Sequence, residues 1–151
     1  MKVGDICARN VVSVREFDEL TAAARVMRER HVGYLVVVVP TVSESALKPV
    51  GVLTDRDIVV GVIARETDPR SLRVGDLMTR QPVMVDEDQP IGAALREMRR
   101  IGVRRIPVVD HSGCLVGVLS LDEIVGALSE ELTDVAGSIR SEVRIEKALR
   151  P

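Results

Sequence analysis

Hydrophobic residues recur along the chain with helical and strand-like spacings that alternate in a fixed order. Two segments place apolar residues at i, i+3, i+4 and i+7 with polar residues between them, which predicts two amphipathic helices. Their apolar positions are Leu20, Ala23, Ala24 and Met27 in the first helix and Ile91, Ala94, Leu95 and Met98 in the second. Short runs rich in β-branched residues precede these helices at 11–14 and 83–85 and follow them at 35–38 and 106–109. Such runs are typical of buried strands.

A further strand and a further helix follow in each half. Turn-forming residues at 110–113 separate two apolar runs, which predicts a hairpin over 106–119. The corresponding connection in the first half, 40–48, is longer and polar, so we expect an exposed loop. Thr54 and Ser120 each follow a strand and precede apolar residues at helical spacing, where a hydroxyl can cap a second helix. The predicted order in each half is therefore strand, helix, strand, strand, helix.

The two halves are copies of one another. Residues 3–38 align with residues 74–109 at a constant offset of 71, and 15 of the 36 aligned positions are identical. After a gap of five residues the alignment resumes, with 51–54 facing 117–120. Two copies of one unit imply packing with pseudo-twofold symmetry and a ligand site between the copies. The expected organisation is a first repeat, a linker, a second repeat and a C-terminal helical extension, at 1–64, 65–73, 74–131 and 132–151 respectively.

The C-terminal extension carries an apolar stripe of its own. From 129 onward the chain keeps a helical pattern, with Leu132, Val135, Ile139 and Val143 on one side and charged residues elsewhere. Neither repeat contains a matching segment. Three alternatives stay open for what covers the stripe: the chain's own domain, a second subunit or a foreign partner.

Composition excludes several classes of function. Hydrophobic residues make up 46% of the chain but aromatic residues only 1%, so the core is aliphatic and base-stacking platforms are almost unavailable. The net charge of -2 gives no general attraction for a polyanion, and nucleic-acid binding is not expected. The most apolar run, 35–39, is far too short to span a membrane. The first residues carry an acidic side chain and no long apolar run, so we expect no signal peptide and a cytoplasmic protein.

The sequence offers no catalytic or metal-binding signature. Cys7 and Cys114 are far apart, and neither has a second cysteine nearby, which favours two reduced thiols. His31 and His111 lie in no zinc-binding motif. No triad, phosphate-binding glycine loop or supported carboxylate pair is present, so we predict no catalytic residues and no metal site.

The duplicated motifs resemble those of a known family. Val-Gly-Asp-Leu-Met-Thr-Arg-x-Pro-Val at 74–83, Val-Arg-Arg-Ile-Pro-Val-Val-Asp at 103–110 and Gly-Val-Leu-Thr-Asp-Arg-Asp-Ile at 51–58 are similar to segments of cystathionine β-synthase (CBS) domains. Their order and duplication resemble a tandem CBS pair, or Bateman module, in a stand-alone protein. The resemblance covers residues 1 to about 131.

The resemblance implies an α+β fold of two packed repeats and a regulatory rather than enzymatic role. It implies that an adenosine-containing ligand (AMP, ADP, ATP, NAD or S-adenosylmethionine, with AMP or ATP expected first) binds in a cleft between the repeats, and that no other cofactor is required. It also implies a homodimer that signals to a separate effector protein. The alternative is an interaction or dimerisation module without a physiological nucleotide, acting through the C-terminal helix.

Thr54 and Asp57 are the strongest candidate ligand contacts. A hydroxyl at a helix start adjoins free backbone N–H groups and suits a phosphate, whereas a carboxylate one turn later matches the paired hydroxyls of a ribose. The other reading is that the two residues only cap the helix. Arg56, Arg104 and Arg105 are candidates for phosphate contacts, because a guanidinium can bind phosphate through two hydrogen bonds.

The family implies that the clefts form crosswise between the repeats. The nucleotide-binding residues expected on this basis are Thr54, Arg56, Asp57, Pro82, Val83, Arg104, Arg105, Ile106, Pro107 and Ser120. A weaker second cleft would combine Ser120 with Val12, Leu35 and Glu123. Glu123 stands where the family prefers Asp, and its extra methylene displaces the carboxylate, so this cleft is expected to be the poorer one.

Overall fold

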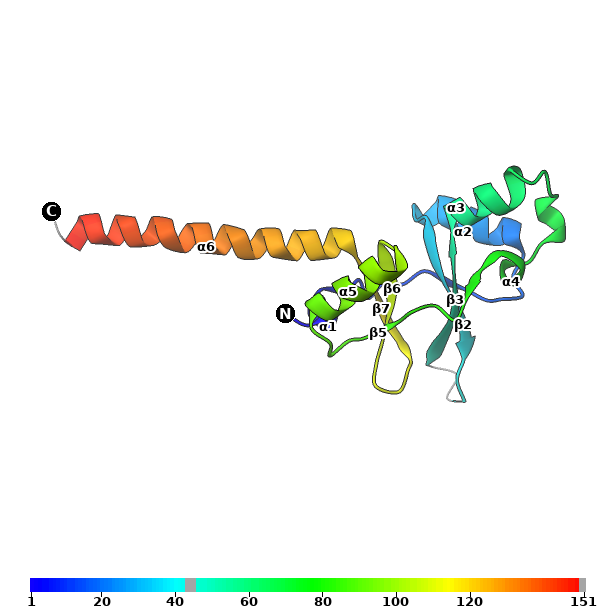
Figure 1. The fold of residues 1–151 in the computed structure, drawn as a ribbon, viewed down its shortest axis with the longest axis horizontal. Helices are drawn as coiled ribbons and strands as arrows, with labels where there is room; N and C mark the ends of the chain where they lie inside the picture. The colour runs from blue at the N-terminus through cyan, green and yellow to red at the C-terminus, as the bar shows by residue number, and fades with distance from the viewer. Residues whose placement is uncertain (43–45, 150–151) are drawn as a thin grey trace.

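The computed structural model describes residues 1–42 and 46–149, and its two repeats lie side by side (Figure 1). The first repeat contains β1 (Ser13–Val14), α2 (Leu20–Arg30), β2 (Tyr34–Pro40), β3 (Leu47–Thr54) and α3 (Asp55–Ile58), which continues as a π-helix, η1 (Val59–Ile63). The second repeat contains β5 (Val85–Asp86), α5 (Ile91–Ile101), β6 (Arg105–Val109), β7 (Leu115–Ser120) and α6 (Leu121–Leu149). The predicted α+β fold and its order of elements are confirmed.

Short elements open each repeat and connect the two. They are α1 (Val3–Ile6), the 3-10 helix η2 (Pro69–Ser71), α4 (Val74–Leu77) and β4 (Thr79–Arg80). The helices α1 and α4 occupy equivalent positions in the two repeats. Each is fixed at its start by an aspartate, since the carboxylates of Asp5 and Asp76 accept the backbone N–H three residues earlier at 2.7 Å.

The strands form two small sheets. One has the order β1-β2-β3-β4 and the other the order β5-β6-β7. The first two strands of each sheet run parallel because a helix crosses over between them, and the remaining neighbours are antiparallel. The hairpin formed by β6 and β7 confirms the predicted turn at 110–113. The exposed loop predicted at 40–48 is too long at both ends, because β2 extends to Pro40 and β3 begins at Leu47, where the two strands still pair. Residues 43–45 of this loop lie outside the described residues.

The opening strands are shorter than the apolar runs predicted. The register with β2 covers Ser13 and Val14, and the Val12 carbonyl accepts from the Val36 N–H (3.3 Å), whereas the Val11 N–H donates to the Arg9 carbonyl in a turn (3.0 Å). In the second repeat the strand begins at Val85 and not at 83, after the chain has crossed from the first sheet.

Each half has its own aliphatic core, but the segment that opens one repeat packs into the core of the other. Val3 and Cys7 lie with Met98 and Leu119 of the second repeat. Val74 and Met78 lie with core residues of the first repeat, which include Leu20, Ala23, Met27, Leu35 and Leu53. Strand β4 likewise joins the first sheet beside β3. The two repeats are therefore interlocked.

Helix α6 extends away from the rest of the molecule (Figure 1). Its first turns contact β7 and α1, and among its described residues only Ile124 is buried. The stripe Leu132, Val135, Ile139 and Val143 is 48–69% exposed, so it does not pack on its own domain. Within residues 1–42 and 46–149, no helix combines the length and apolarity needed to cross a membrane.

Candidate functional site

A cavity of about 610 Å³ opens between the repeats. The first repeat contributes the end of β3 and the start of α3, together with Gly33 and Tyr34 before and within β2. The second contributes Thr79, the segment 81–83, the segment 101–105 and Pro107. Small-molecule sites commonly enclose about 300–1,000 Å³. The structure thus places Thr54 and Asp57 in one cavity with Pro82 and Pro107, in the crosswise arrangement that the family resemblance implies.

Thr54 and Asp57 hold the first-repeat wall of this cavity through a reciprocal capping box. Thr54 Oγ1 accepts a hydrogen bond from the Asp57 backbone N–H (3.1 Å), and Asp57 Oδ2 accepts one from the Thr54 backbone N–H (2.8 Å). Two otherwise unpaired N–H groups at the helix start are satisfied in this way. Asp57 Oδ1 has no hydrogen bond within the described part of the chain. The capping and ligand-binding readings are therefore compatible, because one oxygen holds the helix and the other can accept from a ligand.

The opposite wall is apolar and comes from the second repeat. After β4 the chain turns at Gln81, which has a positive φ of 49° and donates its N–H to the Val50 carbonyl (3.2 Å). This turn brings Pro82 and Val83 to the cavity, beside Pro107 of β6. Proline rings are rigid and lack an N–H, so this wall suits the flat face of an apolar or aromatic group.

Three arginines and two aspartates line the cavity, so its charged side chains have a small excess of positive charge. Arg56 reaches it from α3, and Arg104 and Arg105 reach it from the start of β6. Asp122, in the first turn of α6, is the acidic neighbour of the last two: its Oδ1 lies 3.7 Å from Arg104 Nη2 and its Oδ2 lies 3.9 Å from Arg105 Nη2. Pairs this long and exposed are weak, so both guanidinium groups remain able to bind another anion.

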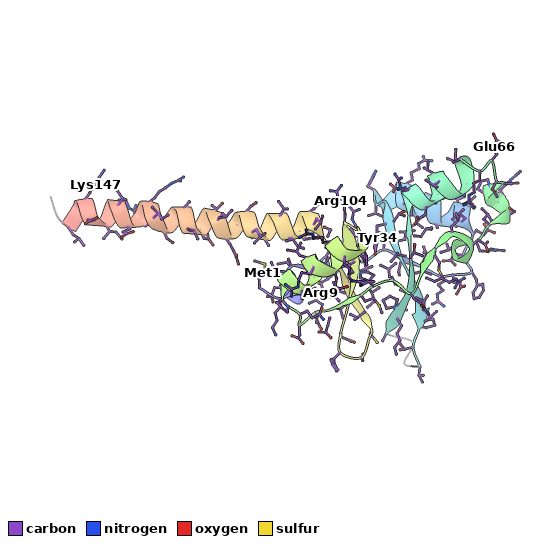
Figure 2. All side chains as sticks on the ribbon, viewed as in Figure 1. Met1, Arg9, Tyr34, Glu66, Arg104 and Lys147 are labelled. Atoms are coloured by element: carbon purple, nitrogen blue, oxygen red, sulfur yellow. The ribbon has the colours of Figure 1, made fainter. Side chains whose placement is uncertain are left out.

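Tyr34 lies between the two repeats close to these arginines. Figure 2 shows Tyr34 and Arg104 where the two halves meet, whereas Lys147 lies far out on α6. Burial raises the pKa of the Tyr34 hydroxyl, and the nearby Arg105 opposes that shift without cancelling it. The hydroxyl is therefore neutral near pH 7 and can act as a hydrogen-bond donor.

A second cavity of about 200 Å³ lies on the other side of Tyr34. It is lined by Ser120, Glu123 and Val12, as the crosswise arrangement predicts for the weaker site. Glu123 folds back onto Ser120, whose backbone N–H donates to Glu123 Oε2 (2.7 Å) and whose hydroxyl also contacts this oxygen. The longer side chain thus forms the same capping box as Asp57, with one carboxylate oxygen held by both groups of Ser120.

Two aligned positions distinguish the cavities. Gly102 ends α5 in the left-handed conformation (φ 71°) and borders the larger cavity, whereas His31 ends α2 in the same conformation (φ 54°) and borders the smaller one. Gly33 aligns with Arg104, so the larger cavity also gains a cation that the first repeat lacks. The side chain of His31 takes up space that Gly102 leaves open, which is consistent with the difference in volume.

Not every residue expected at the site lines a cavity. Thr54, Arg56, Asp57, Pro82, Val83, Arg104, Arg105 and Pro107 line the larger cavity, and Val12, Ser120 and Glu123 line the smaller one. Leu35 and Ile106 are fully buried, and their side chains lie in the two cores. Neighbouring side chains of a strand point to opposite faces, so Ile106 faces the core while Arg105 and Pro107 face the cavity.

Some lining residues have no sequence signal of their own. Gly33, Tyr34 and Gln81 were not among the expected contacts, yet Gly33 and Tyr34 border both cavities. The alignment of Gly33 with Arg104 and of Tyr34 with Arg105 is the one clue that could have placed them there. Among residues 1–42 and 46–149, no cluster of three or more His, Cys, Asp or Glu side chains could hold a metal ion.

Comparison with known proteins follows the division into repeats. The family model of the CBS domain matches residues 3–63 and 74–130. The uncharacterized protein YlbB of Bacillus subtilis is 33% identical over 142 residues, which are 94% of this chain and 90% of that protein. The chain spans 61% of the length of an uncharacterized Methanopyrus kandleri protein, to which it is 29% identical over 83% of its own length.

Two solved structures are similar over most of the chain. A CBS domain protein from Pyrobaculum aerophilum, complexed with AMP, is 27% identical with a TM-score of 0.71 and covers 82% of this chain and 89% of its own. A hexameric CBS-CP12 protein from bloom-forming cyanobacteria is 25% identical with a TM-score of 0.73 and covers 99% of this chain and 84% of its own.

Proposed function

The chain belongs to the CBS-domain family as a tandem pair of repeats, and from that premise we propose that it is a regulatory module that binds an adenosine-containing ligand in the larger cavity. AMP or ATP is the first candidate. One observation carries the proposal: a single cavity of about 610 Å³ combines Asp57, an apolar proline wall and three arginines. An acceptor, an apolar surface and cations are the complements of a ribose, a base and a phosphate respectively.

Each part of the ligand has a matching group. Asp57 Oδ1 can accept hydrogen bonds from the ribose hydroxyls while Oδ2 keeps its bond to the Thr54 N–H. Arg104 and Arg105 make only long ion pairs with Asp122, at 3.7 Å and 3.9 Å. A phosphate in the cavity can therefore bind both guanidinium groups. The adenine ring would lie against Pro82 and Pro107. The AMP complex of the Pyrobaculum aerophilum relative supports this ligand class.

The proposed output is a change in assembly rather than a chemical reaction. Because the cavity walls come from different repeats, a ligand that contacts both would draw the repeats together. We propose that the protein is a homodimer and that occupancy of the cavity alters its geometry toward a separate effector protein. The hexameric cyanobacterial relative, which covers α6 as well as the repeats, supports self-association. Nucleotide that remains intact after prolonged incubation with the protein is the result expected of a sensor without turnover.

The ligand assignment is tested by calorimetric titration of AMP into matched variants. Asp57→Ala removes a charge-assisted hydrogen bond worth about 1.5–3 kcal/mol, so the affinity should fall roughly tenfold to a hundredfold. Glu123→Ala removes the equivalent capping box at the smaller cavity and should change the affinity by less than about twofold. Both variants lose a helix cap, so Glu123→Ala controls for a general loss of stability. Equal affinities in Asp57→Ala and the wild type would refute the assignment.

A further inference from the structure

The exposed side of α6 carries apolar residues with regular spacing. The residues of this 125–139 stripe are Val125, Leu128, Leu132, Val135 and Ile139, and they are 40–69% exposed. They follow one another at intervals of three, four, three and four residues. This alternation is the a/d pattern by which two helices interlock in a coiled coil. Because the stripe is not covered by its own domain, it is available to another helix of the same kind.

The borders of the stripe suit an identical partner. The flanking e and g positions hold Ser129, Glu131, Ala136 and Ser138. Charged flanks of one sign would repel each other when two identical stripes meet, but here three of the four are small and uncharged. Charged residues such as Glu130, Asp134 and Arg140 lie on the opposite side of the helix. A partner selected through complementary charges would find little to pair with along these borders, whereas a second copy of the same stripe would not be repelled.

The helix also needs a partner for its own stability. Beyond its first turns, none of the described side chains of α6 is buried. Gly126 and Gly137 lie inside it, and a glycine in a helix interior is less favourable than an alanine. Helices gain most of their stability in water by packing an apolar side, so pairing of the stripes would supply what the isolated helix lacks.

We infer that two copies of the chain pair through the 125–139 stripe of α6 as a two-stranded coiled coil. The inference identifies the interface of the homodimer proposed above. It depends on no other part of the proposed function. The first turn of α6 carries Asp122, which contacts Arg104 and Arg105 at the cavity. The coiled coil therefore begins next to the ligand site. A movement of Asp122, Arg104 and Arg105 on ligand binding would be transmitted to the first turns of the coiled coil.

The molar mass in solution tests the pairing. Sedimentation equilibrium would compare the wild type with Leu132→Asp, which places a charge in the middle of the stripe, and with Thr133→Asp, which adds the same charge on the other side of the helix. We expect Leu132→Asp to halve the mass and Thr133→Asp to keep that of the wild type. A monomeric wild type, or an unchanged mass for Leu132→Asp, would overturn the inference and leave the stripe to a different protein.

Disulfide cross-linking gives a second measurement that does not depend on disrupting the interface. In a Cys114→Ser background, Leu132→Cys should form a covalent dimer under mild oxidation, while Thr133→Cys should not. Leu132 is the central residue of the stripe, so it meets its own copy in either a parallel or an antiparallel pair. Equal cross-linking at both positions, or none at 132, would contradict the pairing. Neither experiment involves nucleotide, so a failure of AMP binding is distinguished from a failure of the coiled coil.

Discussion

Removal of the charge on Asp122 should strengthen the binding of anionic ligands. This carboxylate contacts Arg104 and Arg105 from the first turn of α6, at 3.7 Å and 3.9 Å. In the alignment of the repeats it stands where the first repeat has Arg56, so the equivalent position carries the opposite charge. A phosphate in the cavity would compete with Asp122 for the same guanidinium groups. Asp122→Asn keeps the size of the side chain and ends that competition.

The size of the effect follows from the geometry of the two pairs. In a medium with the dielectric of water, unit charges 3.7–3.9 Å apart attract by about 1.1 kcal/mol each. Asp122 is 70% exposed and Arg104 is 75% exposed, so solvent screening lowers these values. Exposed pairs typically contribute about 0.2–1 kcal/mol, and the two together therefore about 0.5–1.5 kcal/mol. The affinity for AMP should rise roughly twofold to tenfold.

Calorimetry with AMP and with adenosine separates this effect from a general change in the site. We expect Asp122→Asn to bind AMP more tightly at low salt, with a smaller gain at high salt because ions screen exposed charges. Adenosine, which has no phosphate, should bind both proteins equally. Asp134→Asn removes a charge further along α6 and serves as the control. An unchanged or weaker affinity for AMP, or an equal gain for adenosine, would refute the competition.

Two further predictions concern the cores and the thiols. Gly51→Ala and Gly117→Ala should each destabilise the fold by about 1–3 kcal/mol in urea unfolding, because the added methyl group overpacks the core. A Cβ at Gly51 would lie 2.7 Å from Met78 Sδ, and one at Gly117 would lie 2.7 Å from Cys7 Sγ. Met78 and Cys7 belong to the segments that open one repeat and pack into the core of the other. Gly126 has open space around it, so Gly126→Ala should not destabilise the fold. A similar loss of stability in Gly126→Ala would show that close contact with Met78 or Cys7 is not the cause. Burial raises the pKa of the Cys7 thiol, so a thiol reagent at pH 8 should label the partly exposed Cys114 first, and equal rates by mass spectrometry would contradict this.

The local patterns of the sequence predicted the elements well because each repeat forms them from neighbouring residues. The spacing of Leu20, Ala23 and Met27 reports the buried side of α2 directly, and all three are buried. The turn at 110–113 likewise determines the β6–β7 hairpin from adjacent residues. Duplication supplied part of the long-range information, a ligand site between two packed copies, and the resemblance to the CBS family added that the start of α3 faces the strands of the other repeat.

Other features depend on information that a local pattern does not carry. Val3 and Val74 each follow a basic residue and precede Gly-Asp, so nothing near them shows that each packs into the opposite half. Leu35 and Ile106 lie in runs that are apolar throughout or nearly so, and such runs hide the alternation that turns a side chain toward the core or the cavity. The difference between the cavities arises partly from single residues, such as His31 in place of Gly102, whose consequence appears only once the repeats are packed.

Thermal melting against AMP, ADP, ATP, NAD and S-adenosylmethionine, with GMP as the control, tests the nucleotide-sensor proposal most directly. A ligand present at a hundred times its dissociation constant stabilises the folded state by about 2.7 kcal/mol. For a chain of this size that corresponds to a rise of roughly 5–11 °C in the melting temperature. We expect such a rise with at least one adenosine-containing ligand, little with GMP, and a much smaller one in Asp57→Ala. No rise with any adenosine-containing ligand would contradict the proposed function.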